Sequence, residues 1–343
     1  MPESYSSRAS LGCRLGLLAV CAALQAQPRI GLLDFYGLRH VSEAKLREAL
    51  GVREGDPLPP SKGDAEQRLD DVPGVIESHL EAVCCDQGKM ILYVGIEEKG
   101  ARRFETREPP DGSADLPVDV TNTYKRFLAA SELASRYGQT RDDLTHGHAL
   151  SQNPETREVQ EEFPAVAARY LGDLRHTLRD SSDEAQRAIA VYVIAYARDK
   201  RDIVNDLQYA LKDDDPGVRL NALRGLKALA VYAQLNPQSG VKIEPTWLIE
   251  MLNSLSWQDR MQALGVLEIV TSKPDPDTMD QIRERALDSL VEMARWKTLA
   301  HALPAFLMLG RVAGMPDAAV QAAWTAGERE TVIQAALASK KKK

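Results

Sequence analysis

Apolar residues recur in the second half of the chain at the three- and four-residue spacing that places them on one face of a helix. The stretch DDDPGVRLNALRGLKALA (213–230) is the clearest case. Its Asp215 can accept backbone N–H groups at a helix start, Pro216 suits the first helical position, and Ala222 and Leu226 share one face. The pattern predicts an amphipathic helix that begins after residue 215 and packs against a partner helix.

The same pattern occurs three times when the chain is aligned on an arginine. Each copy has a capping residue, an arginine four positions later and an alanine three positions after that. The positions are Asp183, Arg187 and Ala190, then Asp215, Arg219 and Ala222, then Ser256, Arg260 and Ala263. The arginines are 32 and 41 residues apart, the range of two-helix repeats. We interpret the arginines as structural residues that pair with acids in the adjacent turn, and the alanines as points of close helix approach.

Further amphipathic stretches predict a partner helix before each copy, a fourth helix pair and one long last helix. The expected ranges are 161–178, 201–212 and 245–255 for the partners, 280–296 and 299–314 for the fourth pair, and 317–340 for the last helix, which would cap the stack. The D-x-x-V-R-x-x-A pattern resembles the HEAT family and is best kept in the second copy, since Gln186 and Asp259 replace the valine in the others. This resemblance implies an α-solenoid over 153–340 that binds other proteins.

Residues 28–100 show a different pattern, in which short apolar runs alternate with two amphipathic stretches. Strands are predicted at 29–35, 76–86 and 89–99, and helices at 42–52 and 64–75. Ser42 is a good N-cap, and the Gln-Gly pair before residue 89 is a hairpin signal. In the last strand Leu92, Val94 and Ile96 alternate with less apolar residues, so one face of the sheet is expected to pack on the helices.

This strand–helix–helix–strand–strand order resembles the POTRA family. The resemblance rests on FYGLRHVSEAKLREAL (35–50), GVREGDPL (51–58), LDDVPGVIESHLEAV (69–83) and LYVGIEE (92–98). It implies a domain of the bacterial envelope that binds polypeptides, often by adding a strand to an exposed sheet edge. The domain would cover 28–105, and 106–152 would form a linker with one helix that begins near Val118.

Composition and charge narrow the function classes. The chain of 343 residues is 44% hydrophobic and 27% charged, a globular balance, and its formal net charge of −7 argues against a nucleic-acid partner. Residues 1–26 combine arginines, the apolar run LGLLAVCAAL and a small residue before QP, which is the pattern of a signal peptide. We therefore expect secretion to the periplasm or cell envelope, with no transmembrane segment after its removal. A lipid anchor at Cys21 is disfavoured by the residues before it.

The cysteines and one polar loop are the candidates for chemistry. If the signal peptide is removed, Cys13 and Cys21 leave with it, and only the neighbours Cys84 and Cys85 remain. On a strand one of the two would be buried and the other exposed, so we expect two unpaired thiols, with a disulfide between them or a redox role as alternatives. Asp142, Asp143, His146 and His148 are candidate metal ligands in the loop GQTRDDLTHGHAL, although their spacing matches no established metal motif.

No nucleophile elbow, zinc-protease motif, phosphate loop or dinucleotide fingerprint is present in the sequence, and no cofactor is expected. The sequence thus predicts an α+β protein, with a βααββ POTRA-like domain followed by an all-α HEAT-like solenoid. The expected function is that of a non-enzymatic envelope scaffold or assembly adaptor that binds protein partners. An enzyme or enzyme subunit, lyase- or hydrolase-like, that uses the Asp142–His148 loop and a purely structural solenoid are the alternatives.

Overall fold

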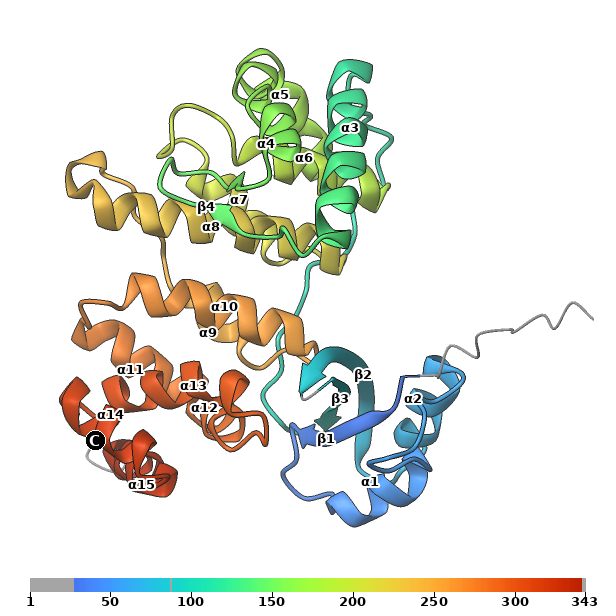
Figure 1. Ribbon diagram of the computed structural model, residues 1–343, viewed down its shortest axis with the longest axis vertical. Coiled ribbons are helices and arrows are strands. Elements are labelled where there is room, and N and C mark those ends of the chain that lie inside the picture. Colours follow the sequence, from blue (N-terminus) through green and yellow to red (C-terminus); the bar gives the residue numbers. More distant parts are fainter. Residues whose placement is uncertain (1–27, 87, 341–343) are drawn as a thin grey trace, which may run out of the picture.

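The computed structural model describes residues 28–86 and 88–340, and it has a mixed α+β fold in which a small three-stranded sheet lies beside many helices (Figure 1). The predicted signal peptide, with Cys13 and Cys21, lies outside the described residues. Within the described residues, no helix has the length and apolar character needed to cross a membrane.

The first part of the chain, called the sheet unit here, spans residues 28–100 and has the predicted order of elements. These are β1 (Ile30–Tyr36), α1 (Glu43–Leu50), α2 (Lys62–Asp70), β2 (Val75–Asp86) and β3 (Lys89–Glu98). The strand order is β1-β3-β2, so β3 is central, parallel to β1 and antiparallel to β2. The predictions of three strands and two helices in this region are therefore confirmed.

Local signals and burial explain why these segments fold as they do. The side chain of Ser42 accepts the N–H of Lys45 at the start of α1, and Gly51, in the left-handed region, ends that helix. The helices then bury Leu46, Leu50, Ala65 and Leu69 against Leu92, Val94 and Ile96 of β3, which together form a separate core. The prediction that this face of the sheet packs on the helices is confirmed.

The second part of the chain is helical. Its elements are α3 (Val118–Arg136), β4 (Asp142–Asp143), β5 (Leu150–Ser151), α4 (Pro154–Gln160), α5 (Phe163–Asp180), α6 (Glu184–Ile194), α7 (Val204–Ala210), α8 (Pro216–Leu235), η1 (Pro237–Ser239), α9 (Thr246–Met251), α10 (Trp257–Val270), α11 (Pro276–Arg285), α12 (Leu287–Ala294), α13 (Leu299–Val312), α14 (Asp317–Thr325) and α15 (Arg329–Lys340). The helices from α5 to α15 are called the helical stack below.

Neighbouring helices of the stack pack as pairs, α5 with α6, α7 with α8, α9 with α10 and α12 with α13. The second helices of successive pairs also contact one another, from α6 to α8, α10 and α13 (Figure 1). Two predictions were wrong. The helix expected at 280–296 is broken at Ala286, which has non-helical backbone angles, and the helix expected at 317–340 is broken where Gly327 adopts a positive φ.

The connector between the two parts is held against the stack. The N–H of Arg107 donates to the carbonyl of Lys212 at 2.6 Å, and the N–H of Ser182 donates to the carbonyl of Gly112 at 2.8 Å. A Cβ at position 112 would overlap the carbonyl of Asp180, so only glycine permits this approach. Residues 101–117 therefore cross the turns of the stack in a fixed course before α3 (Figure 1).

Candidate functional site

The free side of β2 is the first candidate site. β2 lies at one edge of the sheet and pairs with β3 alone among the described strands. The N–H of Leu80 donates to the Glu66 carboxylate at 2.7 Å, so Leu80 turns its backbone away from β3. Because backbone direction alternates along a strand, Ser78 and Ala82 turn the same way. These residues form an outward row of backbone groups, which we call the β2 edge.

The β2 edge is covered near its middle by Glu66 of α2, through both its side chain and its backbone. Glu66 accepts the N–H of Leu80, and its backbone carbonyl accepts the Ser78 hydroxyl at 3.0 Å. On either side of this contact the side chains of Ile76 and Ala82 are exposed, Ile76 by 51%. Ser78 and Leu80 are buried beneath α2, so an incoming extended chain has to displace the Glu66 contacts before it can pair with β2.

The opposite edge of the sheet, along β1, is already occupied. The N–H of Gly55 donates to the carbonyl of Ile30 at 2.7 Å, and the N–H of Ile30 donates to the carbonyl of Asp56 at 2.9 Å. Further along the strand, the Lys297 ammonium donates to the carbonyl of Leu33. The loop after α1 and the loop before α13 therefore cover β1, whereas no described strand pairs with the outer side of β2.

The face of the sheet that points away from α1 and α2 is buried on the helical stack. Tyr93 of β3 stacks on Trp257 with ring centroids 5.2 Å apart, and its hydroxyl lies 2.7 Å from Nδ1 of His301. The Tyr36 hydroxyl donates to the carbonyl of Leu255 at 2.5 Å. Desolvation by burial raises the pKa of Tyr36. With both faces covered, the sheet unit offers its edge rather than a face.

A row of side chains across the sheet anchors this contact. Asp34 and Glu81 are register neighbours of Tyr93 on its two sides. Asp34 accepts the N–H of Lys297 at 2.9 Å, and Glu81 accepts the Ser256 hydroxyl at 3.2 Å. Burial raises the pKa of both carboxyl groups. Hydrogen bonds from the stack are the strongest influence in the opposite direction, but they do not cancel the effect of burial. The docking surface is thus polar at both margins and aromatic in its centre.

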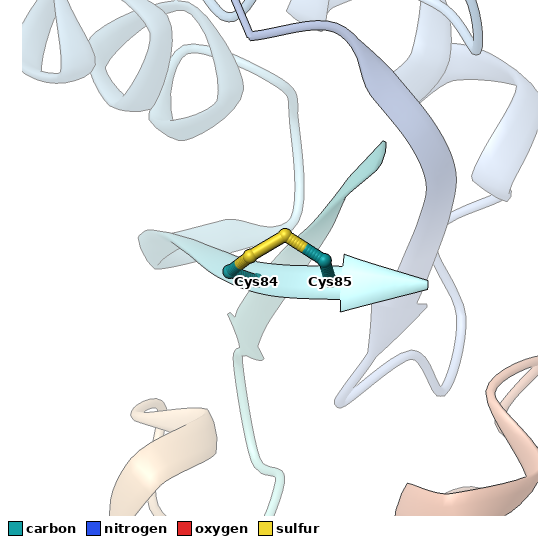
Figure 2. The surroundings of a disulfide bond; sticks show 2 residues. All are labelled: Cys84 and Cys85. Atoms are coloured by element: carbon teal, nitrogen blue, oxygen red, sulfur yellow. A yellow bond between two sulfur atoms is a disulfide. The ribbon is translucent and has the colours of Figure 1, made fainter. Parts of the chain in front are cut away.

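Cys84 and Cys85 lie at the end of β2, beside the β2 edge. The structure joins them by a disulfide, and Figure 2 shows the two sulfur atoms meeting on one side of the strand. Both residues are exposed, so the expectation of two unpaired thiols, one buried and one exposed, was wrong. That expectation assumed a regular strand, whereas the pairing of β2 with β3 shifts register between Val83 and Asp86.

The loop that contains the four candidate metal ligands brings Asp143 and His146 together but gives Asp142 and His148 other partners. Asp142 pairs with Arg224 at 2.8 Å, and Asp143 accepts the N–H of Thr145 at 2.9 Å and lies 3.3 Å from His146. His148 turns away to Lys200. Within 28–86 and 88–340, no group of three His, Cys, Asp or Glu side chains is arranged to hold a metal ion.

His148 and Lys200 form a partly buried contact that ties this loop to the end of α6. The Lys200 ammonium lies 3.2 Å from Nδ1 of His148 and donates to the carbonyl of Ala195 at 3.1 Å. Burial lowers the pKa of Lys200 to about 8. Burial, and then the charge of Lys200, lowers the pKa of His148 to about 4, so the imidazole is neutral at pH 7 and can accept a hydrogen bond.

The repeat positions occupy equivalent places in the stack. The side chains of Asp183, Asp215 and Ser256 accept backbone N–H groups at the starts of α6, α8 and α10. The three alanines that follow are fully buried; they are Ala190, Ala222 and Ala263. These residues therefore serve the stack itself.

The three repeat arginines connect each turn to the next one. Arg187 pairs with Asp213 at 2.8 Å, and Arg219 pairs with Asp259 at 2.9 Å. Arg260 reaches Glu292 at 3.4 Å and lies over the ring of Tyr36, 4.4 Å from its centroid. Sequence reasoning assigned the arginines a structural role but read Asp259 only as a departure from the repeat pattern. The sequence feature that could have identified Asp259 as the partner of Arg219 is the presence of an acid at a repeat position that is otherwise apolar.

The four tryptophans of the stack differ in exposure. Trp247 is 38% exposed, while Trp257 and Trp324 are partly buried and Trp296 is buried. Trp247 lines a cavity of about 700 Å³ together with Arg107, Tyr209 and Lys212, whose ammonium lies 4.4 Å from the indole centroid. Among the four tryptophans, Trp247 is the one with surface to offer a partner.

No protein-family model matches this chain, and neither the curated proteins nor the solved structures contain a significant match. The functional assignment therefore depends on the residues and the geometry described above.

Proposed function

We propose that the protein is a non-enzymatic scaffold of the cell envelope that binds an extended segment of a client protein along the β2 edge. The observation that carries this proposal is the asymmetry of the sheet, in which the protein's own loops cover β1 whereas β2 pairs with a single one of the described strands. The POTRA-like order of the sheet unit and the HEAT-like repeats of the stack are part of the same proposal.

Binding would exchange the contacts of Glu66 with Ser78 and Leu80 for backbone hydrogen bonds to the client. The incoming chain takes the N–H of Leu80 from Glu66 and pairs with the outward groups of Ser78 and Ala82. Main-chain hydrogen bonds supply affinity in this mode, and alternate side chains supply specificity. Ile76, exposed at one end of the edge, gives the client an apolar contact.

The helical stack would act as a rigid support and as a second binding surface. The aromatic and carboxylate contacts of Tyr93, Tyr36 and Glu81 hold the sheet in one orientation on α10 and α13. A fixed edge does not lose orientational freedom when it binds, which favours affinity. The cavity beside Trp247 is available for a second partner, and the two sites together would make the protein an adaptor.

The purely structural alternative has one observation in its favour, since the sheet unit buries a whole face on the stack and could serve only as its cap. The scaffold function and the purely structural function predict different effects of a proline at Ala82. Proline there removes an outward N–H and leaves the ladder between β2 and β3 intact. Ala82→Ser keeps the N–H and is the matched control.

The test is site-specific photo-cross-linking in the native host, with the reactive group at Ile76. We expect a client adduct that Ala82→Pro reduces at least about tenfold and Ala82→Ser leaves unchanged, the loss expected for about 1.4 kcal/mol of binding energy. A reactive group at Lys45, exposed on α1, should give no such adduct. An adduct insensitive to Ala82→Pro would exclude strand addition.

The envelope location has its own measurement. Mass spectrometry of the mature N-terminus after cell fractionation should find a chain that begins near Gln27 in the envelope fraction. A chain that retains Met1 in the cytoplasm would overturn the location while leaving the β2 edge to be tested in that compartment.

A further inference from the structure

The disulfide between Cys84 and Cys85 occupies the one irregular place in the β2–β3 pairing beyond the first residues of β2. Val83 pairs with Ile91 and Asp86 pairs with Lys89, so Cys84 and Cys85 together stand opposite Met90. Two residues facing one is the geometry of a β-bulge. Both cysteines are exposed, and Cys84 is separated by Val83 alone from Ala82, the last outward residue of the β2 edge.

The bond and the bulge have a common geometric reason. Neighbouring side chains on a regular strand point to opposite faces of the sheet. Two sulfur atoms can bond across neighbouring residues only where the strand departs from this alternation, and Figure 2 shows them meeting on one side of β2. Bulges are one of the devices by which proteins end or blunt an edge that could otherwise pair with another chain.

We propose that Cys84 and Cys85 form a thiol–disulfide exchange site whose redox state sets how far the β2 edge extends. In the oxidised protein the regular edge ends at Ala82. In the reduced protein Cys84 and Cys85 continue the regular strand, so the edge gains the outward backbone groups of Cys84 while those of Cys85 face β3. The exchange chemistry stands alone, whereas its consequence for client binding rests on the strand addition proposed above.

The reactant is a dithiol, supplied by a reducing protein or a small molecule. One thiolate of the dithiol attacks the sulfur of one cysteine, which breaks the Cys84–Cys85 bond, forms a mixed disulfide and releases the other cysteine as a thiolate that takes up a proton. The second thiol of the dithiol then attacks the mixed disulfide and releases the first cysteine. Two electrons and two protons pass to the cysteines, and the dithiol becomes a disulfide.

Exposure is what makes this pair reactive. Exchange requires direct access of the attacking sulfur to the disulfide, and exposed disulfides are the labile and regulatory ones. Neither sulfur is covered by α2, whose contacts with the β2 edge are at Ser78 and Leu80. Reduction therefore needs no unfolding of the sheet unit or of its contact with the stack.

The test treats the purified full chain with dithiothreitol under native conditions, followed by alkylation and peptide mapping. We expect both Cys84 and Cys85 to be alkylated after reduction and neither before it. Backbone amide exchange in peptides covering 83–91 should then slow by about fivefold or more, because a regular ladder replaces the bulge. The variant with both Cys84→Ser and Cys85→Ser is the control and should show the slow exchange with or without dithiothreitol.

Each outcome is decisive. A pair that stays unreactive to native dithiothreitol overturns the exchange site. A pair that is reduced with no change of amide exchange in 83–91, or a serine variant that still responds to dithiothreitol, overturns the effect on the edge. This experiment contains no client, so its result does not depend on the Ala82→Pro test. The exchange site and the strand addition can therefore fail independently of each other.

Discussion

The two faces of the three-stranded sheet are buried by different means. The buried core of the face towards α1 and α2 is aliphatic, with Leu92, Val94 and Ile96 among its residues and Phe35 packed at its margin. The face towards the stack is closed by Tyr36 and Tyr93, with carboxylates of Asp34 and Glu81 at its margins. The first face comes from residues near in sequence, whereas the second depends on partners more than 150 residues away, and that contact leaves the edge as the accessible surface.

The largest expected effect comes from emptying the centre of the stack-facing side. Tyr93→Ala removes a buried ring that packs on Trp257, Trp296 and His301 and should destabilise the protein by about 3–5 kcal/mol. Denaturant unfolding followed by tryptophan fluorescence measures this cost. We expect the sheet unit to detach while its own aliphatic core persists, seen as an early transition in fluorescence without a loss of sheet signal in circular dichroism. A single unchanged transition would contradict separate faces.

A backbone position gives a second, smaller effect on the same side. A Cβ added at Gly95 would lie 2.5 Å from the carbonyl of Leu255 and 2.9 Å from the Tyr36 hydroxyl. Gly95→Ala should therefore cost about 1–3 kcal/mol by overpacking the docking surface. Gly63→Ala is the control, because nothing lies within 4 Å of its added Cβ and alanine favours helix α2. Equal melting temperatures for the two variants would show that the faces are not in contact in solution.

The same contrast explains how much the sequence could predict. The order of strands and helices, the caps at Ser42 and Asp215 and the aliphatic side of β3 follow from local patterns, and the structure confirms them. The buried position of Tyr93 could not be predicted in this way, because alternation along one strand cannot distinguish a solvated tyrosine from one that packs on a distant tryptophan. The disulfide likewise required a bulge that the alternating pattern of β2 does not reveal.

Charge partners across the repeats were also beyond the sequence pattern. The arginines were recognisable because they recur, but their acceptors come from different positions, Asp213 before a helix, Asp259 within the first turn of α10 and Glu292 near the end of α12. The same ion-pair geometry recurs, but the acids come from different positions of the repeat, so they produce no periodic pattern in the sequence. The pairing could be expected, while the identity of each partner needed the fold.

Removing one hydroxyl should sharpen the comparison further. Tyr93→Phe keeps the ring between Trp257 and Trp296 but loses the hydrogen bond to His301. The expected cost is about 1 kcal/mol, the net worth of a typical buried hydrogen bond, and it should appear as a lower urea midpoint with an unchanged slope. Val94→Ile, on the aliphatic face, is the matched control, and it should leave the His301 imidazole resonances in place while Tyr93→Phe shifts them. Unmoved resonances in Tyr93→Phe would place Tyr93 elsewhere.

The smallest effect is a pH dependence confined to the stack-facing side. Desolvation raises the pKa of Glu81 in the folded protein above its usual value near 4.5, so the folded state holds the proton more tightly than the unfolded state. The contribution of Glu81 to the free energy of unfolding is therefore fully present below pH 4.5, the usual pKa, and is lost as the pH rises through the higher pKa of the folded state. Glu81→Gln keeps an acceptor for the Ser256 hydroxyl and removes the charge, so its free energy of unfolding should exceed that of the parent chain at pH 7 and match it near pH 4. Glu48→Gln, on the exposed side of α1, is the control, and its difference in free energy of unfolding from the parent chain should not change with pH. A difference between Glu81→Gln and the parent chain that is independent of pH would mean that Glu81 is solvated rather than docked on α10.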